Sequence, residues 1–435
     1  MLDNRNIFSK KKILIYGLGK SGTAAYKFLK KENELFLYDD QINNNTRKSI
    51  NKKLINYKKL VKKQIDYIVV SPGINIENCK LSSFLKKNSD KIHTDLDVFY
   101  SKYSKNKNIT ITGTNGKSTT AKILYEVLKY QKKDVRLVGN IGNAILSEKK
   151  IKSNTIFVIE ASSYQLDYSK IFKTNISAIL NISPDHLERH RTLNNYINAK
   201  FKLLNNQTKN DYAILNTNNF YIKKYLKNKK LVPKIKKVNR QIESSFLREI
   251  NNPYFLTEGN KENLSFVLKI ANILNVKKKI LFKALKNFNG LKYRQQIIFK
   301  SKKLTIINDS KATSFSSSVS ILKSLSNVYW IVGGLAKKGD QFVLPKNKCK
   351  NFKAYIFGKN NIFFVKAVKN LMSYETFINL RSLIKKIFLD IKKSKNKINQ
   401  TILFSPAAAS FDDFKNFEER GKYFNTLSKK FNNVK

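Results

Sequence analysis

Cysteine is scarce in this chain of 435 residues, which contains only Cys79 and Cys349. The two lie far apart and outside any metal-like spacing, so the sequence predicts neither a disulfide framework nor a zinc site. We expect both to be small buried side chains. Long apolar runs are also lacking: none approaches the ~18 residues of a membrane-spanning helix, and no signal-peptide core follows the basic N-terminus. These absences predict a cytoplasmic protein without a membrane span.

Acidic residues are few as well. The chain has 30 Asp and Glu against 85 Lys and Arg, a formal charge of +55. Such a charge suggests nucleic-acid binding. Here, however, lysine is spread along the whole chain, and no arginine-rich arm or RNA-binding aromatic motif accompanies it. We therefore expect no specific nucleic-acid partner, although the positive field would favour a nucleotide substrate. A monomer is expected.

The predicted fold class is α/β. An apolar strand leads into a glycine-containing turn three times, at residues 12–22, 108–118 and 328–334, and a helical pattern is expected to follow each turn. At roughly 150 residues per domain, this length suggests about three domains. We expect a Rossmann-like N-terminal domain (1–93), a central P-loop ATPase-type domain (94–294) and a Rossmann-like C-terminal domain (295–435).

The strongest local motif is Gly113-Thr114-Asn115-Gly116-Lys117-Ser118-Thr119, which follows a strand and opens a helix. Backbone N–H groups and the helix dipole would converge on one point, where Lys117 reaches phosphates and the Ser118 hydroxyl holds Mg²⁺. Two residues separate the glycines where four are usual. A chance Gly-Lys-Ser turn is the alternative, but the flanking strand and helix favour nucleotide binding.

Two further strands end in polar groups. The run 156–159 ends in Glu160, the arrangement that aims a carboxylate at the metal of a neighbouring phosphate loop. The strand 178–182 leads into a turn with His186, which would suit a metal-neighbouring site. A surface glutamate and solvent-exposed histidines are the alternatives. Taken alone, Lys200 is one lysine among many.

The N-terminal turn has the dinucleotide fingerprint. Gly17, Gly19 and Gly22 are followed by Asp39 at the end of the next strand. The pattern specifies only a tight turn and a phosphate-tolerant helix N-terminus, so it is weak evidence for NAD. A second loop at 71–73 would lie at the same edge of the sheet. Together the two loops indicate a pocket for a nucleoside diphosphate, and an NAD-dependent dehydrogenase is the alternative.

Taken in order, the segments resemble the Mur ligases over essentially the whole chain. The matching motifs are Gly-Thr-Asn-Gly-Lys-Ser-Thr, Glu-Ala-Ser-Ser-Tyr-Gln, Asn-Ile-Ser-Pro-Asp-His-Leu, Asn-Asp-Ser-Lys-Ala-Thr and the segment 405–421. The last of these resembles the closing motif of the members that add D-glutamate. The sequence departs from the family at Asn260, which lacks a preceding histidine, at Tyr293, where histidine is common, and at Asp40 and Gln41.

The resemblance implies a role for each matching position. The ATP contacts would be Gly113, Thr114, Asn115, Gly116, Lys117, Ser118, Thr119, Thr120, Asn260, Asn263, Arg294 and Asp309. The UDP-linked substrate would contact Lys20, Ser21, Asp39, Ser71, Pro72, Gly73, Asn140, Ser162, Gln165 and His186. The incoming D-glutamate and the acyl-phosphate end would contact Lys311, Thr313, Lys337, Ser410 and Phe417. The Mg²⁺ ligands would be Ser118, Glu160, His186 and Lys200, the last as a carbamate. The catalytic residues would be Lys117, His186, Lys200 and Lys311.

The activity implied by this resemblance is the ATP-dependent joining of D-glutamate to UDP-N-acetylmuramoyl-L-alanine through an acyl phosphate, a step of peptidoglycan precursor synthesis. The implied cofactors are ATP and Mg²⁺. Two alternatives stay open: a Mur-type ligase that adds another amino acid, and a basic nucleotide-binding protein that has lost catalysis.

Overall fold

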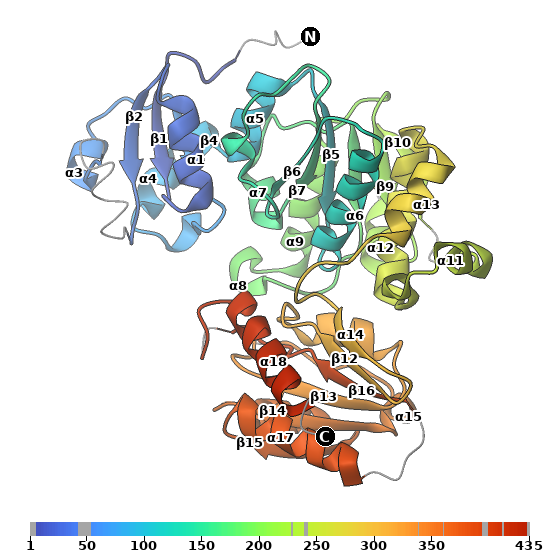
Figure 1. Ribbon diagram of the computed structural model, residues 1–435. Helices are drawn as coiled ribbons and strands as arrows, with labels where there is room; N and C mark the ends of the chain where they lie inside the picture. Colours follow the sequence, from blue (N-terminus) through green and yellow to red (C-terminus); the bar gives the residue numbers. More distant parts are fainter. Residues whose placement is uncertain are drawn as a thin grey trace. The chain divides into compact units, whose positions relative to one another are not determined.

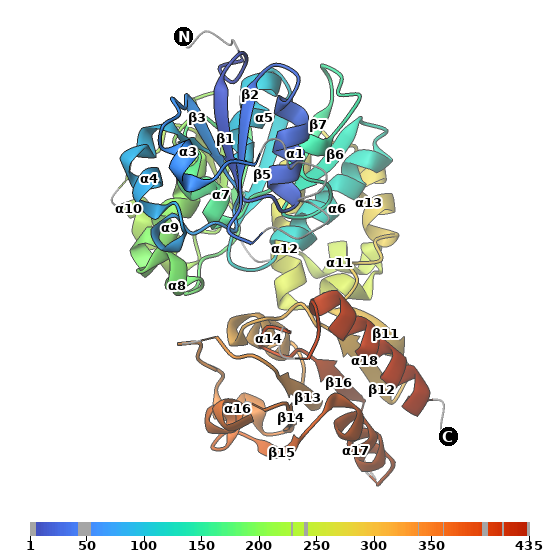
Figure 2. The same cartoon turned by 90° about the vertical axis from the view of Figure 1, so that its left-hand side faces the viewer.

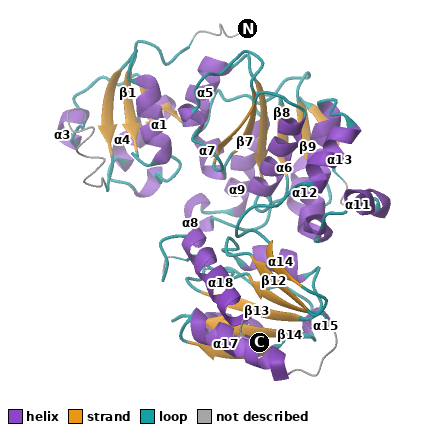
Figure 3. Ribbon diagram, viewed as in Figure 1, coloured by secondary structure: helices purple, strands orange, loops and turns teal. Residues whose placement is uncertain are grey.

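In a computed structural model, the described residues of the chain form three sheets (Figures 1 and 3). The described residues are 6–41, 54–227, 229–238, 242–337, 339–359, 361–393, 399–410 and 413–432. Parallel strands alternate with helices, so the predicted α/β class is confirmed.

The chain divides into two units. One comprises Met1–Gln241 with Asn263–Ala284, and the other comprises Ile242–Glu262 with Leu285–Lys435. The first two sheets lie in the first unit and the third sheet lies in the second. The three domain ranges expected from the sequence each contain one sheet, and their limits remain a prediction.

The first sheet contains four parallel strands in the order β2-β1-β3-β4. Its strands are β1 (Lys12–Tyr16), β2 (Glu34–Tyr38), β3 (Tyr67–Val70) and β4 (Ile92–His93), with helices α1 (Lys20–Leu29), α3 (Tyr57–Leu60) and α4 (Ser82–Lys87). Residues 13–16 are fully buried, as expected for a parallel strand covered on both faces. Because β1 pairs with β2 and β3, the loops after these three strands open at one carboxyl edge.

The second sheet contains six parallel strands in the order β10-β9-β8-β5-β7-β6. Its strands are β5 (Lys107–Thr112), β6 (Val135–Gly139), β7 (Ile156–Glu160), β8 (Ile176–Ile179), β9 (Tyr212–Leu215) and β10 (Lys234–Lys237). The helices between residues 94 and 294 are α5 (Asp95–Tyr103), α6 (Lys117–Tyr130), α7 (Ser163–Tyr168), α8 (Leu187–His190), α9 (Leu193–Phe201), α10 (Phe220–Lys227), α11 (Ser244–Ile250), α12 (Glu258–Ile273) and α13 (Lys278–Lys286). Of these, α11 and the first residues of α12 belong to the second unit. From β5 the chain passes to β6 and β7 on one side and then to β8 on the other. The carboxyl end of β5 is therefore the switch point at which ligands bind in open α/β sheets.

One apolar cluster joins the two sheets of the first unit. It contains Ile13 and Leu35 from the first sheet, Leu96 from α5, and Val138 and Phe157 from the second sheet. Each fully buried side chain of this kind contributes about 1.5–3 kcal/mol. The segment Ile145–Ser147 also packs against α1 and α5. This shared core fixes the carboxyl edges of the two sheets relative to each other.

The third sheet has the order β11-β12-β16-β13-β14-β15 and is parallel except for β11. Its strands are β11 (Gln296–Lys300), β12 (Leu304–Asn308), β13 (Val328–Gly333), β14 (Phe352–Phe357), β15 (Ser373–Phe377) and β16 (Gln400–Phe404). Its helices are α14 (Phe315–Leu322), α15 (Lys346–Cys349), α16 (Asn361–Val368), α17 (Leu380–Lys393) and α18 (Phe417–Asn432). As Figure 2 shows, α14 and α16 cover one face, and α17 and α18 cover the other.

Two local features differ from expectation, at the third glycine turn and at one cysteine. The turn at Gly333 and Gly334 leads first into a loop, and the next helix, α15, has only four residues. The lysine-rich segment 223–237 contains the end of α10 and the edge strand β10, and its lysines are exposed. Cys349 is buried as expected, whereas Cys79 is partly exposed. Within the described ranges, no helix is both long enough and apolar enough to cross a membrane.

Candidate active site

Three segments with predicted catalytic or metal-binding residues meet at the carboxyl edge of the second sheet. The 113–118 loop follows β5, Glu160 ends β7, and the segment with His186 follows β8. Because β5 is hydrogen-bonded to both β7 and β8, the three ends are adjacent. The order of the strands therefore brings together motifs that lie up to about 70 residues apart in the sequence.

The backbone of the 113–118 loop is held from two directions. Asn181 accepts hydrogen bonds from the backbone N–H groups of Thr114 and Asn115, each at 2.8 Å. Gly116, at φ 83°, is the N-cap of α6, and a Cβ there would lie 2.1 Å from Asn263 Oδ1. Only glycine fits this approach without displacing Asn263. The N-terminus of α6 therefore presents its N–H groups at a fixed loop, the usual arrangement for binding phosphate.

Lys117 supplies positive charge at this loop. It is the first residue of α6, and its Nζ donates to the carbonyl oxygens of Gly113 at 2.9 Å and Thr114 at 2.6 Å. Its ammonium therefore lies on the loop itself. A triphosphate bound at the helix N-terminus would meet both the helix dipole and this charge.

Ser118 and Glu160, two of the predicted metal ligands, are in direct contact. The Ser118 hydroxyl donates to Glu160 Oε2 at 2.6 Å, and Asn140 Nδ2 donates to Glu160 Oε1 at 3.0 Å. Glu160 is buried. A hydroxyl and a carboxylate beside a phosphate loop are the hard oxygen ligands that Mg²⁺ prefers, so these two residues fit that ion.

Lys200 is buried beneath the same loop. Its Nζ donates to Gly113 O at 2.8 Å and lies 4.5 Å from the centre of the Tyr196 ring, and only 1% of the residue is exposed. Burial, together with the nearby charge of Lys117, lowers the pKa of the Lys200 ammonium well below its usual value. The position therefore favours the neutral amine of Lys200 over its ammonium form.

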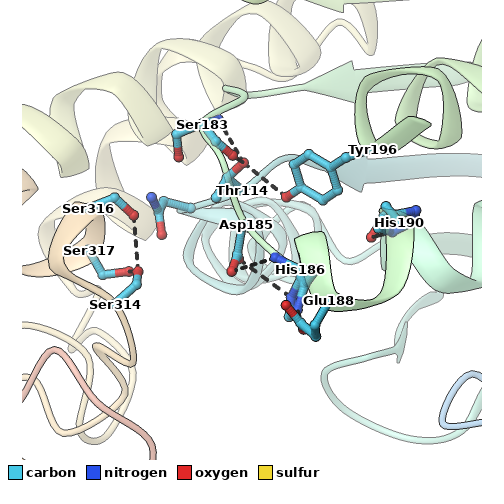
Figure 4. A network of polar contacts seen from close by, with 12 residues as sticks. Thr114, Ser183, Asp185, His186, Glu188, His190, Tyr196, Ser314, Ser316 and Ser317 are labelled. Carbon is cyan, nitrogen blue, oxygen red and sulfur yellow. Dashed lines mark hydrogen bonds and ion pairs between the residues drawn. The ribbon is translucent and has the colours of Figure 1, made fainter. Parts of the chain in front are cut away.

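His186 lies on the segment after β8. Its ring nitrogens lie 3.5 Å from Asp185 Oδ2 and 3.4 Å from Glu188 Oε1, and Figure 4 shows the three side chains pointing toward one another. His186 is at φ 55°, directly before α8. Among the residues that the structure describes, no group of three His, Cys, Asp or Glu side chains forms a metal site. Ser118 and Glu160 are in direct contact, and the charges of Glu160 and Asp185 act on Lys200; that Ser118, Glu160, His186 and Lys200 form one ligand set stays a prediction.

The first sheet presents a second glycine loop, at 17–22. Leu18 N donates to Asp39 Oδ2 at 2.5 Å, and Ser71 Oγ donates to Gly17 O at 2.6 Å. Gly22 approaches so closely that a Cβ would lie 1.8 Å from Gly17 O. The ends of β1, β2 and β3 therefore gather the predicted substrate residues of this sheet, as expected. Pro72 and Gly73 lie in the turn after Ser71.

Asp95 links this loop to the second sheet. It is the first residue of α5, is buried, and accepts from Gln165 Nε2 at 3.1 Å and from the Ser21 hydroxyl. Burial raises the pKa of its carboxyl, although both hydrogen bonds act in the opposite direction. Gln165 also forms a capping box with Ser162 at the start of α7. Three predicted substrate residues from two sheets are thus arranged around one carboxyl that the sequence did not single out.

The third sheet gathers the remaining predicted residues at its own carboxyl edge. Lys311 and Thr313 follow β12, Lys337 follows β13, and Ser410 follows β16, and these strands are neighbours in the sheet. Lys311 Nζ lies 4.1 Å from the centre of the Phe417 ring. Figure 4 shows the hydroxyls of Ser314, Ser316 and Ser317 that follow Thr313.

Asp309 ends the same edge in a buried position. It accepts from Gln295 N and from Ser405 Oγ, each at 3.1 Å. Burial raises the pKa of its carboxyl to about 7, although those hydrogen bonds and the charge of Arg294 lower it. Of the two asparagines expected to face adenine, Asn263 lies against the 113–118 loop, whereas Asn260 donates to Tyr254 O at 2.8 Å.

Two arginines that the sequence did not single out also hold the candidate loops. Arg189, on α8, donates to the carbonyl oxygens of Pro72 and Ile74. Arg420 is fully buried and donates to Ser310 O at 2.7 Å and Ala408 O at 2.9 Å. Each of these arginines donates to backbone carbonyls of other loops, so no local sequence pattern could have revealed the contacts.

Comparisons with known proteins agree with this arrangement. A model of the Mur ligase middle domain matches residues 111–253, and a model of the MurD-like N-terminal domain of Mur ligases matches residues 11–92. The chain is 34% identical to the UDP-N-acetylmuramoylalanine–D-glutamate ligase of Rickettsia prowazekii, with 98% of this chain and 99% of that protein covered. The corresponding ligase of Caldicellulosiruptor bescii is 31% identical over 95% of this chain and 96% of its own.

Solved structures resemble the chain in fold. The MurF ligase of Thermotoga maritima in complex with ADP superposes with a TM-score of 0.57 at 14% identity, covering 99% of this chain and 97% of that chain. UDP-N-acetylmuramate–alanine ligase from the same organism gives a TM-score of 0.54 at 17% identity, covering 97% of this chain and 99% of that one. Both likenesses extend over nearly the whole length.

Proposed function

The chain belongs to the Mur ligase family, and we propose that it is a member that joins D-glutamate to UDP-N-acetylmuramoyl-L-alanine with conversion of ATP to ADP and phosphate. The observation that carries this proposal is the full-length similarity to ligases named for that reaction, at 34% identity. The resemblance of the segment 405–421 to the closing motif of the D-glutamate-adding members supports the same choice.

The 113–118 loop is the proposed site of the ATP phosphates. Its N–H groups and Lys117 offer positive potential at the switch point of the second sheet. Ser118 and Glu160 would hold Mg²⁺, which would offset charge on the transferring phosphoryl group. Asn263 borders this loop and would lie near the nucleotide.

The chemistry requires activation because a carboxylate does not accept an amine at neutral pH. The terminal carboxylate of the UDP-linked substrate would attack the γ-phosphorus of ATP, giving an acyl phosphate and ADP. The amine of D-glutamate would then attack the acyl carbon, and phosphate would leave as the amide forms and the amine loses its proton. Lys117 would stabilise the transferring group by its fixed charge. Lys311 and Ser410 would hold the D-glutamate end.

Lys200 has a separate proposed role as a carbamate. Its buried amine would add to CO₂, forming an N–C bond and releasing one proton, so that a cation becomes a carboxylate-like anion. The lowered pKa supports this step because only the neutral amine is nucleophilic. A carbamate oxygen would also suit Mg²⁺, whereas an ammonium would repel it.

The UDP-linked substrate would lie along the joined edges of the first two sheets. The 17–22 loop, Ser71 and Asp39 would face the nucleotide end, and Asn140, Ser162 and Gln165 would face the muramoyl-alanine end. Asp95 supports this placement because it bridges Ser21 and Gln165.

One assay tests the proposed reaction. Phosphate release is measured with ATP, Mg²⁺ and UDP-N-acetylmuramoyl-L-alanine across a panel of amino acids that includes D-glutamate, L-glutamate, L-alanine and a diamino acid. We expect turnover with D-glutamate alone, and Lys117→Ala serves as the inactive control. Turnover with another amino acid would instead identify a different member of the family. No turnover with any of them would support a protein that has lost catalysis.

A further inference from the structure

Arg189 connects the two sheets of the first unit at their carboxyl edges. It lies on α8, the short helix that His186 precedes. Its Nη1 donates to Pro72 O at 2.8 Å, and its Nη2 donates to Ile74 O at 2.5 Å. A guanidinium has donors in a rigid plane, so two acceptors fix its orientation as well as its position.

The guanidinium is also supported from the side of the second sheet. It lies 4.1 Å from the centre of the Tyr164 ring and 5.7 Å from that of Tyr168, both on α7. The Tyr164 ring in turn lies 5.0 Å from the His186 ring. The Arg189 side chain therefore extends from α8, packs against α7 and contacts the turn of the first sheet.

The turn that Arg189 contacts belongs to the candidate substrate site. Ser71 Oγ donates to Gly17 O, and Ile74 N donates to Ser71 O at 3.0 Å, closing the turn. The Ile74 side chain fills the space beside Gly17, where a Cβ would lie 2.9 Å from it. Ser71 thus fastens this turn to the 17–22 loop, while Arg189 fastens it to α8.

We propose that Arg189 is a positioning residue that sets the affinity for the UDP-linked substrate by fixing the 71–74 turn against α8. This inference rests on the proposed function, since it concerns the same site. Ser71 attaches the turn to the first sheet. The two hydrogen bonds from Arg189 hold the same turn at a fixed position relative to the second sheet. A substrate that contacts both sheets can bind at its two ends only when the turn and the second sheet are correctly placed relative to each other.

Arg191 provides a matched control within the same segment. It also reaches the first sheet, where its Nη2 lies 2.8 Å from Glu77 Oε2, but 66% of its side chain is exposed. Glu77 already has a second partner in Lys86 at 2.8 Å. Exposed ion pairs of this kind contribute little, so Arg191→Ala should change no kinetic constant by more than about threefold.

The experiment compares Arg189→Ala, Arg189→Lys and Arg191→Ala with the wild-type chain. Steady-state kinetics are measured with the UDP-linked substrate varied at saturating ATP and D-glutamate, and then with ATP varied. For Arg189→Ala we expect the KM for the UDP-linked substrate to rise by about tenfold or more, because two charge-assisted hydrogen bonds are lost. The kcat and the KM for ATP should stay within about threefold, since the 113–118 loop is untouched.

Two further readouts separate positioning from simple loss of stability. Added guanidinium at low millimolar concentration should restore part of the affinity of Arg189→Ala, and Arg189→Lys should recover only part because an ammonium cannot replace a planar fork. If Arg189→Ala fails to fold, Arg189→Lys carries the test alone. A KM unchanged in both Arg189 variants, or an equal effect of Arg191→Ala, would overturn the proposal. The D-glutamate-dependent turnover of the wild type is measured separately. Its absence would contradict the proposed function, whereas the comparison of the variants tests the role of Arg189.

Discussion

The first unit contains the triplet Gly-Lys-Ser twice, each time at the start of a helix that follows a parallel strand. Gly19 and Gly116 are the N-caps of α1 and α6, and the lysine and serine of each triplet are the first two residues of the helix. In both copies the serine pairs with a buried carboxyl: Ser21 with Asp95, and Ser118 with Glu160. The lysines differ. Lys117 donates to its own loop at Gly113 and Thr114, whereas Lys20 donates to Gly142 O at 2.7 Å, beyond the second sheet's β6.

The difference shows that the same three residues serve two purposes. At 113–118 the lysine, the serine and Glu160 remain at the helix N-terminus and form a site of charge. At 17–22 an acidic side chain, Asp39, takes the N–H of Leu18, and Lys20 and Ser21 reach to the second sheet. The first triplet, at 19–21, thus mainly connects the first sheet with the region of the second sheet. The second triplet, at 116–118, is a candidate phosphate-binding site. The partners of the triplet, more than the triplet itself, decide its role.

The largest effect is expected at Lys200, which donates to the loop of the second copy. Lys200→Ala should reduce ligase turnover to near the background, because the proposed carbamate ligand is lost. Short carboxylates such as acetate should partly restore turnover by occupying the vacated position. Turnover is measured by phosphate release.

Lys202 is the matched control for Lys200. It lies two residues further along the chain and pairs with Asp167 Oδ1 at 2.8 Å in a partly exposed position. Lys202→Ala should change turnover only slightly. If the two variants behave alike, the assigned role of Lys200 is wrong.

Lys117→Ala should produce the next largest effect. Loss of a fixed charge at the transferring phosphoryl group should remove about 2–4 kcal/mol of transition-state stabilisation, or roughly 30- to 900-fold in turnover. The KM for the UDP-linked substrate should change little, since the Lys117 ammonium donates to Gly113 and Thr114 of the 113–118 loop, which is the proposed ATP site. Turnover within about tenfold of wild type contradicts a catalytic role for this lysine.

Lys20→Ala is the counterpart in the first copy and should act differently. Loss of its hydrogen bond to Gly142 O should raise the KM for the UDP-linked substrate by about three- to tenfold, with kcat nearly unchanged. Steady-state kinetics with each substrate varied in turn provide the measurement. A fall in kcat as large as that of Lys117→Ala would remove the distinction between the two copies.

The smallest effect concerns the carboxyl of the first copy and its pH dependence. Burial raises the pKa of Asp95, so its stabilising contribution is greatest below the ordinary carboxyl pKa of about 4 and is lost as pH rises through its folded value. The asparagine of Asp95→Asn cannot ionise. The melting temperature of this variant should therefore rise relative to that of the wild type as pH increases above about 4.

Asp97, two residues further on, supplies the opposite case. It is equally buried, but hydrogen bonds from His93, Ser169 and the backbone of Lys170 outweigh that burial and lower its pKa. Its contribution is present above a pH of about 4 and is lost as pH falls through its folded value. Asp97→Asn should therefore lower the melting temperature at pH 7, and the deficit should shrink in acid. Thermal unfolding of both variants from about pH 2 to 8 tests the pair, because the Asp97 deficit shrinks only below the ordinary carboxyl pKa of about 4, and parallel curves contradict it.

Much of this arrangement follows from the sequence because parallel strands place their carboxyl ends at one edge. That rule correctly grouped the 113–118 loop with Glu160 and the segment of His186, and the 17–22 loop with Ser71. The strands are apolar and uninterrupted, so their positions could be read locally.

The remaining features depend on long-range packing. Arg189 and Asp95 acquire their roles only because the first two sheets share one core, and no local pattern encodes that contact. The burial of Lys200 cannot be read from the sequence among so many lysines, because it arises where α9 contacts the loop that follows β5. The edge strand β10 was not predicted because its lysines leave no clear alternation of apolar and polar residues, although charged residues commonly protect sheet edges.

The most direct test of the distinction between the two Gly-Lys-Ser copies is calorimetric titration of the full-length chain with a non-hydrolysable ATP analogue and, separately, with UDP-N-acetylmuramoyl-L-alanine. Wild type, Lys117→Ala and Lys20→Ala are each titrated with both ligands in the presence of Mg²⁺, and NAD serves as the negative control. We predict that Lys117→Ala weakens binding of the ATP analogue alone and that Lys20→Ala weakens binding of the UDP-linked substrate alone. Competition between the two ligands for one site, or tight binding of NAD at the 17–22 loop, would contradict the assignment.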